Sequence, residues 1–168
     1  LGEVNAAVDE GTPIEVADRA LEPLGLPLSP FVLLQLVGPA VALHVSETLH
    51  EAFPDRFGVS STVRAIVEAK RSGVYAWGMD GKPYVDEEMQ ALLPHGGSPS
   101  TEEQVLERAL AALAQECRIM LADGIVAEAA DIDLCMLLGA GWPFHLGGIT
   151  PYLDRTGISE KVTGHRFL

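Results

Sequence analysis

The residues Ile14–Leu21 read IEVADRAL and the residues Val126–Leu134 read VAEAADIDL, and each stretch follows an acidic residue and a glycine. These pairs are Glu10-Gly11 and Asp123-Gly124, so their glycines lie 113 residues apart. Four residues of the first stretch have an identical residue 113 positions later in the second stretch. The matching pairs are Glu15 and Glu128, Ala17 and Ala130, Asp18 and Asp131, and Leu21 and Leu134. A sequence that repeats itself in this way predicts an architecture built by duplication.

A corner of glycine and proline follows each stretch. In the first copy Leu24–Pro30 reads LGLPLSP, and in the second Leu138–Phe144 reads LGAGWPF, with two extra residues. Two copies are too few for a solenoid, which needs about three or more repeats. We therefore expect two related helical units that pack on each other.

Composition limits the kind of protein. The chain has 168 residues, of which 48% are hydrophobic, so it has enough apolar material for a core. Its net charge of -13 argues against binding to nucleic acid or to an anionic membrane. No apolar run approaches the ~20 residues of a membrane span, and no signal-peptide pattern is present, so we expect a cytoplasmic protein. Because it opens at Leu1 within helical periodicity, the chain also looks like a piece of a longer one.

Helix signals fill the first half of the chain. We expect a helix over residues 1–10, and a second helix that Thr12 caps together with Glu15. Ser29-Pro30 should open a third helix, and a fourth over residues 40–53 should pack through one apolar face. That face consists of Val41, Val45, Thr48, Leu49 and Ala52. Two shorter helices, one capped by Ser60 or Ser61 and one over residues 86–93, complete this half.

The pattern changes twice further along. Residues 74–85, with the turn Asp80-Gly81, predict a small extended excursion or hairpin. Residues 94–100 are rich in glycine, proline and serine and predict a linker. Ser100 and Glu103 form the pattern of a capping box, which should start a long helix to about residue 123. Helices over residues 128–138 and 150–157 should follow.

Six to eight helices and almost no sheet define an all-α fold class. We expect two helical domains, residues 1–93 and residues 101–168, joined by the linker at residues 94–100. Strict alternation of strands and helices is absent, so this piece is not a nucleotide-binding sheet. Cys117 and Cys135 lie in apolar helical stretches and are expected to be reduced core residues.

Several groups of glycines or polar residues could in principle form a ligand, metal or catalytic site. For each group a purely structural role is favoured. The glycines of residues 139–148 follow a helix rather than a strand, which favours a tight corner over a phosphate cradle. Asp131, Asp133 and His145 fit no recognised metal-ligand spacing. His44 lies beside an apolar helix face and is expected to be a partly buried structural histidine. No catalytic or metal-binding residue is therefore assigned.

Longer motifs in both copies resemble a known family. The residues 122–133, 139–148 and 152–157 resemble the final helical domain of the multifunctional fatty-acid oxidation alpha subunits. The residues 25–31 and 36–38 resemble the C-terminal domain of L-3-hydroxyacyl-CoA dehydrogenases, although this family usually has glycine where Ser29 stands. Ser72–Trp77 resembles the family's glycine and aromatic motif.

The resemblance implies a fold like the C-terminal domain of 6-phosphogluconate dehydrogenase, present twice and related by a pseudo-two-fold axis. In that family a preceding Rossmann domain holds NAD and carries the catalytic histidine and glutamate. A further active-site asparagine has a Val-Asn-Arg context, which Asn5 does not match. We therefore expect this chain to bind no cofactor and to be inactive alone.

The resemblance also implies what the intact protein does. It should oxidise L-3-hydroxyacyl-CoA to 3-ketoacyl-CoA with NAD, be fused to an enoyl-CoA hydratase and have a thiolase subunit as partner. This chain should supply one wall of the acyl-CoA cleft, with Pro27, Leu28, Ser29 and Pro30 as the substrate contacts. From the residues alone, a plain helix start remains the simpler reading of this corner. The alternative function is a stand-alone helical association module without catalysis.

Overall fold

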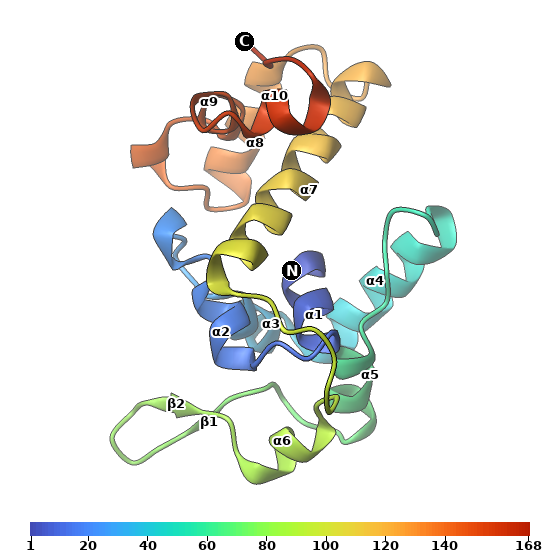
Figure 1. Cartoon of the computed structure of the whole chain (residues 1–168), viewed down its shortest axis with the longest axis vertical. Coiled ribbons are helices and arrows are strands. Elements are labelled where there is room, and N and C mark those ends of the chain that lie inside the picture. The colour runs from blue at the N-terminus through green and yellow to red at the C-terminus, as the bar shows by residue number, and fades with distance from the viewer. The chain divides into compact units, whose positions relative to one another are not determined.

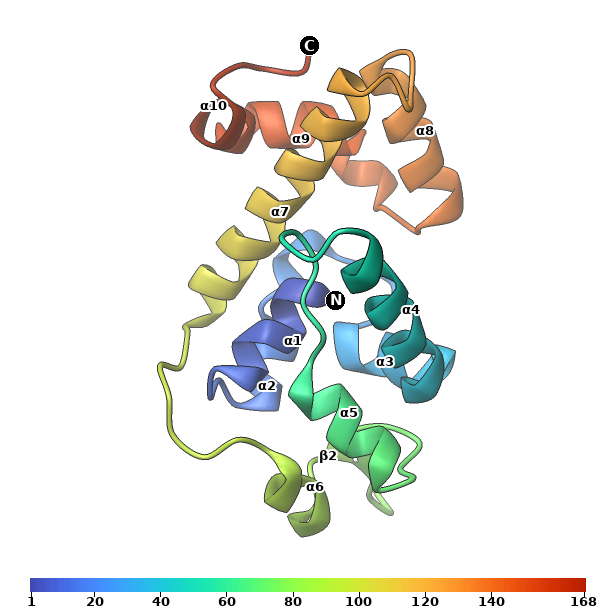
Figure 2. The ribbon, with the colours of Figure 1, turned by 90° about the vertical axis from the view of Figure 1, so that its right-hand side faces the viewer.

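The computed structural model describes residues 1–168, and Figures 1 and 2 show a chain made almost entirely of helices. Contacts divide it into two compact units, one of Leu1–Leu21 with Leu28–Val105 and one of Glu22–Pro27 with Leu106–Leu168. The short segment Glu22–Pro27 thus packs with the second half of the sequence. The predicted all-α fold class is confirmed.

The first unit contains six helices and one hairpin. They are α1 (Gly2–Asp9), α2 (Ile14–Arg19), α3 (Pro30–Val37), α4 (Pro39–Ala52), α5 (Ser61–Glu68), β1 (Ala76–Trp77), β2 (Pro83–Tyr84) and α6 (Glu87–Leu92). Strand β1 pairs antiparallel with β2, with Ala76 opposite Tyr84. The hairpin predicted around Asp80-Gly81 is therefore present, and Asp80 Oδ1 accepts a hydrogen bond from the backbone N of Lys82 at 3.1 Å.

The core of the first unit forms where α1 packs against α2 and α5. Helix α1 buries Val4, Ala7 and Val8, which share one face because they are three and four residues apart. Its last residue, Asp9, accepts hydrogen bonds from the backbone N of Ser61 and of Thr62 at the start of α5, at 3.2 and 2.9 Å. This carboxylate satisfies N–H groups that have no partner within their own helix.

The second unit contains three complete α-helices, α7 from Leu106 onward and two short 3₁₀ turns. They are η1 (Glu22–Leu24), α7 (Glu102–Ala122), α8 (Ala129–Gly139), η2 (Phe144–Leu146), α9 (Ile149–Arg155) and α10 (Ile158–Thr163). Helix α9 packs against both α8 and α10 (Figure 2). Helix α10 was not among the helices expected from the sequence, and the ten α-helices exceed the six to eight predicted.

Two predicted helix caps are wrong in their residue. Thr12 does not cap α2; it is buried, and its Oγ1 accepts a hydrogen bond from the backbone N of Ser100 at 2.9 Å. The capping box of α7 lies one residue later than expected. The backbone N of Gln104 donates to Thr101 Oγ1 at 3.3 Å, and the backbone N of Thr101 donates to Gln104 Oε1 at 2.9 Å. Ser100 is held by Thr12 instead, so Thr101 takes the cap.

The apolar face predicted to be packed on α4 is largely exposed. Val41 is 54% exposed and Val45 is 50% exposed, whereas Leu43, on another side of the helix, is buried. His44, expected to be partly buried, is exposed as well. Helical periodicity located the apolar stripe correctly but does not say whether a neighbour covers it.

Length and apolarity do not coincide in any one helix to the degree that crossing a bilayer requires. Helices α3 and α4 meet that test only when they are taken together, and they are bent by 98° at the break between them. Gly38 lies at this break with φ +95°, a conformation that favours glycine.

The two cysteines are free thiols in different surroundings. Cys117 is buried, as expected, but Cys135 is exposed, so the prediction of a second core cysteine is wrong. Burial and the nearby charge of Asp133 raise the pKa of the Cys117 thiol to about 11.

Candidate functional site

The predicted substrate corner is the turn that leads into α3. Leu28 is partly exposed, and Pro30, the first residue of α3, is buried. Ser29 holds the N-cap position, but its side chain makes no capping hydrogen bond to the helix. Its hydroxyl donates to Asp18 on α2, and the same aspartate provides the cap of α3.

A buried carboxylate on α2 fixes this corner. Asp18, which is 6% exposed, accepts hydrogen bonds from Ser29 Oγ at 2.7 Å and from the backbone N of Phe31 at 2.8 Å. The second bond satisfies an N–H in the first turn of α3. Asp18 therefore caps α3 in place of the Ser29 side chain. It also bonds the residues on both sides of Pro30, namely Ser29 and Phe31.

Tyr75 completes the network from the glycine and aromatic motif. Its hydroxyl donates to Asp18 Oδ2 at 2.7 Å, so one carboxylate joins α2, the start of α3 and the segment before β1. Burial and the hydrogen bond to Asp18 raise the pKa of Tyr75 far above its usual 10.0, so the phenol stays protonated and donates. The three donors compensate a charge that burial would otherwise penalise.

Pro27 lies in the other unit. The segment Glu22–Pro27 packs with the second repeat, where a Cβ built at Gly141 would come within 3.2 Å of Pro27 Cγ. In the same segment, a Cβ at Gly25 would come within 3.1 Å of His145 Cε1. Of the four predicted contact residues, Leu28, Ser29 and Pro30 thus belong to the first unit and Pro27 to the second.

The second unit repeats the carboxylate network in a simpler form. Asp133 on α8 accepts hydrogen bonds from the backbone N and the Oγ1 of Thr150 in α9, both at 2.8 Å. Phe31 and Thr150 thus have the same role at the start of α3 and of α9. By this role the counterpart of Asp18 is Asp133. The alignment of the two stretches by their preceding glycines had paired Asp18 with Asp131, two residues too early.

Glycines confirm this corrected register. Gly38 and Gly157 are separated by the same number of residues as Phe31 and Thr150. Both glycines have positive φ and lie between two consecutive helices. The order α1, α2, α3, α4 is therefore repeated as α7, α8, α9, α10. The spacing of 113 residues between Gly11 and Gly124 does not hold for Asp18 and Asp133, which are 115 residues apart. The second repeat has two extra residues before α8, in addition to those in the glycine corner.

The same register explains the glycine at residue 148. It stands where the first repeat has Ser29, and a Cβ there would collide with the carboxylate of Asp133. In the first repeat Ser29 occupies this position, and its hydroxyl donates a hydrogen bond to Asp18. The sequence had no signal for this network beyond an aspartate among apolar residues and a tyrosine 57 positions later.

The polar residues once considered for metal binding have structural partners. Asp131 Oδ2 accepts hydrogen bonds from the backbone N of Ala127 at 3.1 Å and of Glu128 at 3.3 Å, ahead of α8. Asp133 holds Thr150, as described. In the glycine corner Trp142 is buried and its Nε1 donates to the carbonyl O of Gly147 at 2.9 Å. The indole therefore fills the loop in which a phosphate would have to lie.

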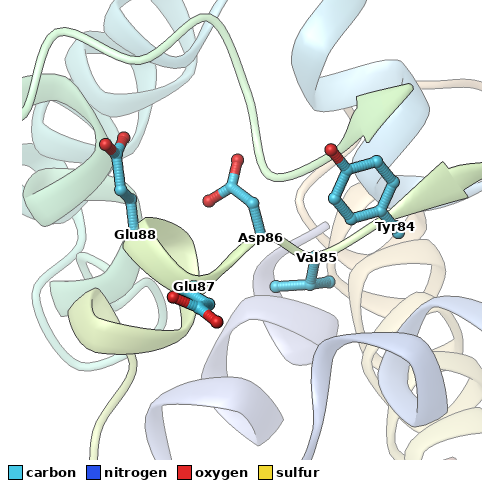
Figure 3. A pocket seen from close by; sticks show the side chains of 5 residues that line it. All are labelled: Tyr84, Val85, Asp86, Glu87 and Glu88. Atoms are coloured by element: carbon cyan, nitrogen blue, oxygen red, sulfur yellow. The ribbon is translucent and has the colours of Figure 1, made fainter. Parts of the chain in front are cut away.

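A hollow at the start of α6 is a separate surface feature. It is lined by Tyr84, Val85, Asp86, Glu87 and Glu88, and Figure 3 shows the three carboxylates spread around the first turn of the helix. Arg71 pairs with Asp86 at 2.5 Å and with Glu88 at 3.2 Å. The Arg71 guanidinium, with a backbone hydrogen bond from Met89, lowers the pKa of Asp86. The hollow shares no residue with the predicted corner.

Comparison with known proteins places the first repeat in a family. Residues 1–76 match the family described as 3-hydroxyacyl-CoA dehydrogenase, C-terminal domain. This match ends just after Tyr75, so it includes the whole Asp18 network. The chain therefore contains a 3-hydroxyacyl-CoA dehydrogenase C-terminal domain.

Similarity to individual proteins extends through the second repeat. The chain is 30% identical over 177 aligned residues to the fatty acid oxidation complex subunit alpha of Acinetobacter baylyi, and 29% identical to that of Acinetobacter baumannii. Each alignment covers 96% of the chain and 25% of the relative. The chain thus spans about a quarter of the length of these curated relatives and is related to fatty acid oxidation complex alpha subunits.

Proposed function

We propose that the natural protein carrying this chain oxidises L-3-hydroxyacyl-CoA to 3-ketoacyl-CoA with NAD. The observation that carries the proposal is the match of residues 1–76 to the dehydrogenase C-terminal domain, together with similarity to alpha subunits over 96% of the chain. The experiment is a spectrophotometric assay of the complete gene product with NAD and a series of 3-hydroxyacyl-CoA substrates of increasing chain length, beginning with 3-hydroxybutyryl-CoA. Formation of NADH is expected, and its absence would overturn the proposal.

Within that protein, this chain supplies one wall of the acyl-CoA cleft. Its contact residues are Pro27, Leu28, Ser29 and Pro30. The geometry supports this role because the corner combines a partly exposed apolar side chain, Leu28, with a backbone that Asp18 fixes from beneath. Ligand sites are mainly apolar surfaces with a few well-placed polar groups, and this corner has that character.

The described residues do not fit NAD. Dinucleotide sites use a glycine-rich turn between a parallel strand and a helix. Here the strands are the two-residue β1 and β2 of an antiparallel hairpin, and the glycine corner follows a helix and encloses Trp142. We assign NAD and the catalytic acid-base residues to another part of the natural protein, so this chain alone should be inactive.

The second repeat has an architectural role in this proposal. A duplicated helical unit in one chain can replace the pairing of two subunits by a pseudo-two-fold arrangement. An enoyl-CoA hydratase in the same polypeptide, a thiolase subunit as partner and a cytoplasmic location belong to the same proposal. They rest on the relatives being alpha subunits of a fatty acid oxidation complex.

The second candidate function is a helical association module without catalysis. The observation that favours it is the exposed apolar stripe of α4, which includes Val41, Val45 and Leu49. The assay described above separates the two functions. A complete gene product that forms no NADH from any 3-hydroxyacyl-CoA would favour the association module.

A further inference from the structure

Asp18 has more hydrogen bonds than the start of α3 requires. Accepting from the backbone N of Phe31 is enough for Asp18 to cap α3, just as Asp133 caps α9 by accepting from the backbone N of Thr150. Asp18 additionally accepts from Ser29 Oγ and Tyr75 Oη, both at 2.7 Å. These two hydroxyls come from chain segments 46 positions apart. Helix capping alone does not account for them.

The additional bonds act on the corner itself. Ser29 lies between Leu28 and Pro30, so its bond to Asp18 fixes the backbone at the centre of the corner. The bond from Tyr75 holds the carboxylate in turn, because a carboxylate with three donors has little freedom to rotate. In the second repeat the corresponding position is Gly148, which has no side chain to anchor. The reinforced network is therefore specific to the repeat with the proposed substrate contacts.

We propose that Asp18 is a positioning residue for acyl-CoA binding, which it serves by holding Leu28, Ser29 and Pro30 through the hydroxyls of Ser29 and Tyr75. The inference rests on the proposed function, since it needs the corner to contact the substrate. In this role Asp18 acts through the corner, because its carboxylate is occupied by Ser29, Phe31 and Tyr75. Its loss should therefore weaken binding of the acyl-CoA more than it slows the chemical step.

The test compares Ser29→Ala and Tyr75→Phe with Thr150→Val in the complete gene product. Each variant removes one hydroxyl-to-aspartate hydrogen bond, and Thr150→Val does so in the second repeat. The steady-state KM is measured separately for 3-hydroxybutyryl-CoA and for NAD, together with kcat and the melting temperature. Ser29→Thr keeps the hydroxyl and serves as the conservative variant.

We expect Ser29→Ala and Tyr75→Phe each to raise the KM for the acyl-CoA about 3- to 10-fold, the effect of losing one hydrogen bond. The KM for NAD should change less than about 2-fold, and Ser29→Thr should restore most of the acyl-CoA affinity. Thr150→Val should lower the melting temperature without changing either KM.

Two outcomes would overturn the inference, and they are distinguishable. If the unmodified protein is active but Ser29→Ala and Tyr75→Phe only lower the melting temperature, as Thr150→Val does, the network is structural and the proposed function stands. If the unmodified protein forms no NADH, the proposed function fails and the positioning role fails with it.

Discussion

At the scale of single residues, Asp18 and Asp133 show how one carboxylate fixes the start of the next helix in both repeats. Both accept a hydrogen bond from the backbone N–H of the second residue of a helix that begins after a corner. The difference lies in the side chains that join them. Tyr75 and Ser29 reinforce Asp18, whereas Thr150 alone supplies both bonds to Asp133.

The two cysteines provide a prediction about reactivity. At mildly alkaline pH, Cys135 should react rapidly with a disulfide reagent such as DTNB, and Cys117 should react at least about a hundredfold more slowly. The reason is that Cys117 is 4% exposed and has a pKa of about 11, so little thiolate is present. Cys135→Ser should abolish the fast phase, and Cys117→Ser should leave it intact. A fast phase that survives in Cys135→Ser would contradict this assignment.

Asp154 provides a prediction about pH. Burial opposes its ionisation, but hydrogen bonds from the Ser159 side chain and from the backbone N of Phe167 and Leu168 outweigh burial and lower its pKa below 3.8. Because the folded pKa is lowered, Asp154 stabilises the fold above the unfolded pKa, and this contribution is lost as pH falls through the folded pKa.

Asp154→Asn should therefore lower the free energy of unfolding at pH 7 by about 1–3 kcal/mol. The gap between the variant and the unmodified chain should close as the pH falls below 3.8. Urea unfolding at a series of pH values measures both curves. Parallel curves throughout the acid range would show that the charge of Asp154 does not contribute.

At the scale of elements, the cap of α7 distinguishes two readings of the same sequence. Thr101→Ala should lower the free energy of unfolding by about 0.5–2 kcal/mol, because Thr101 Oγ1 accepts from the backbone N of Gln104. Ser100→Ala is the matched control and should have little effect, since the structure uses the backbone N of Ser100, not its side chain, to bond Thr12. Urea unfolding measures both variants. A larger loss of unfolding free energy from Ser100→Ala than from Thr101→Ala would support the capping box of Ser100 and Glu103 predicted from the sequence.

Helices and the hairpin were largely predictable because periodicity, proline and glycine act locally. The Asp80-Gly81 turn and the Ser60 cap, which accepts from the backbone N of Val63, needed only neighbouring residues. The errors arose where a distant residue decides the outcome. Ser100 displaced the expected caps by bonding Thr12 across 88 positions, and Asp18 took over from Ser29. For the same reason the sequence could propose the corner but not the carboxylate that fixes it.

At the scale of the whole molecule, the duplication is the organising feature. The helices α1 to α4 recur in order as α7 to α10, and helix α5, the hairpin and helix α6 lie between the two sets. The first set matches the dehydrogenase C-terminal domain, and the second is covered by the similarity to the alpha subunits. Chemical function in our proposal is correspondingly divided, with substrate contact in the corner after α2 and an architectural role for the second set.

The most direct measurement is NADH formation from 3-hydroxybutyryl-CoA, made side by side with the complete gene product and with residues 1–168 alone. The account predicts turnover by the complete gene product, and neither turnover nor calorimetric binding of NAD by residues 1–168. NAD binding or turnover by residues 1–168 alone would contradict the assignment of the cofactor site to another part of the protein. Absence of turnover in the complete gene product would contradict the proposed dehydrogenase function itself.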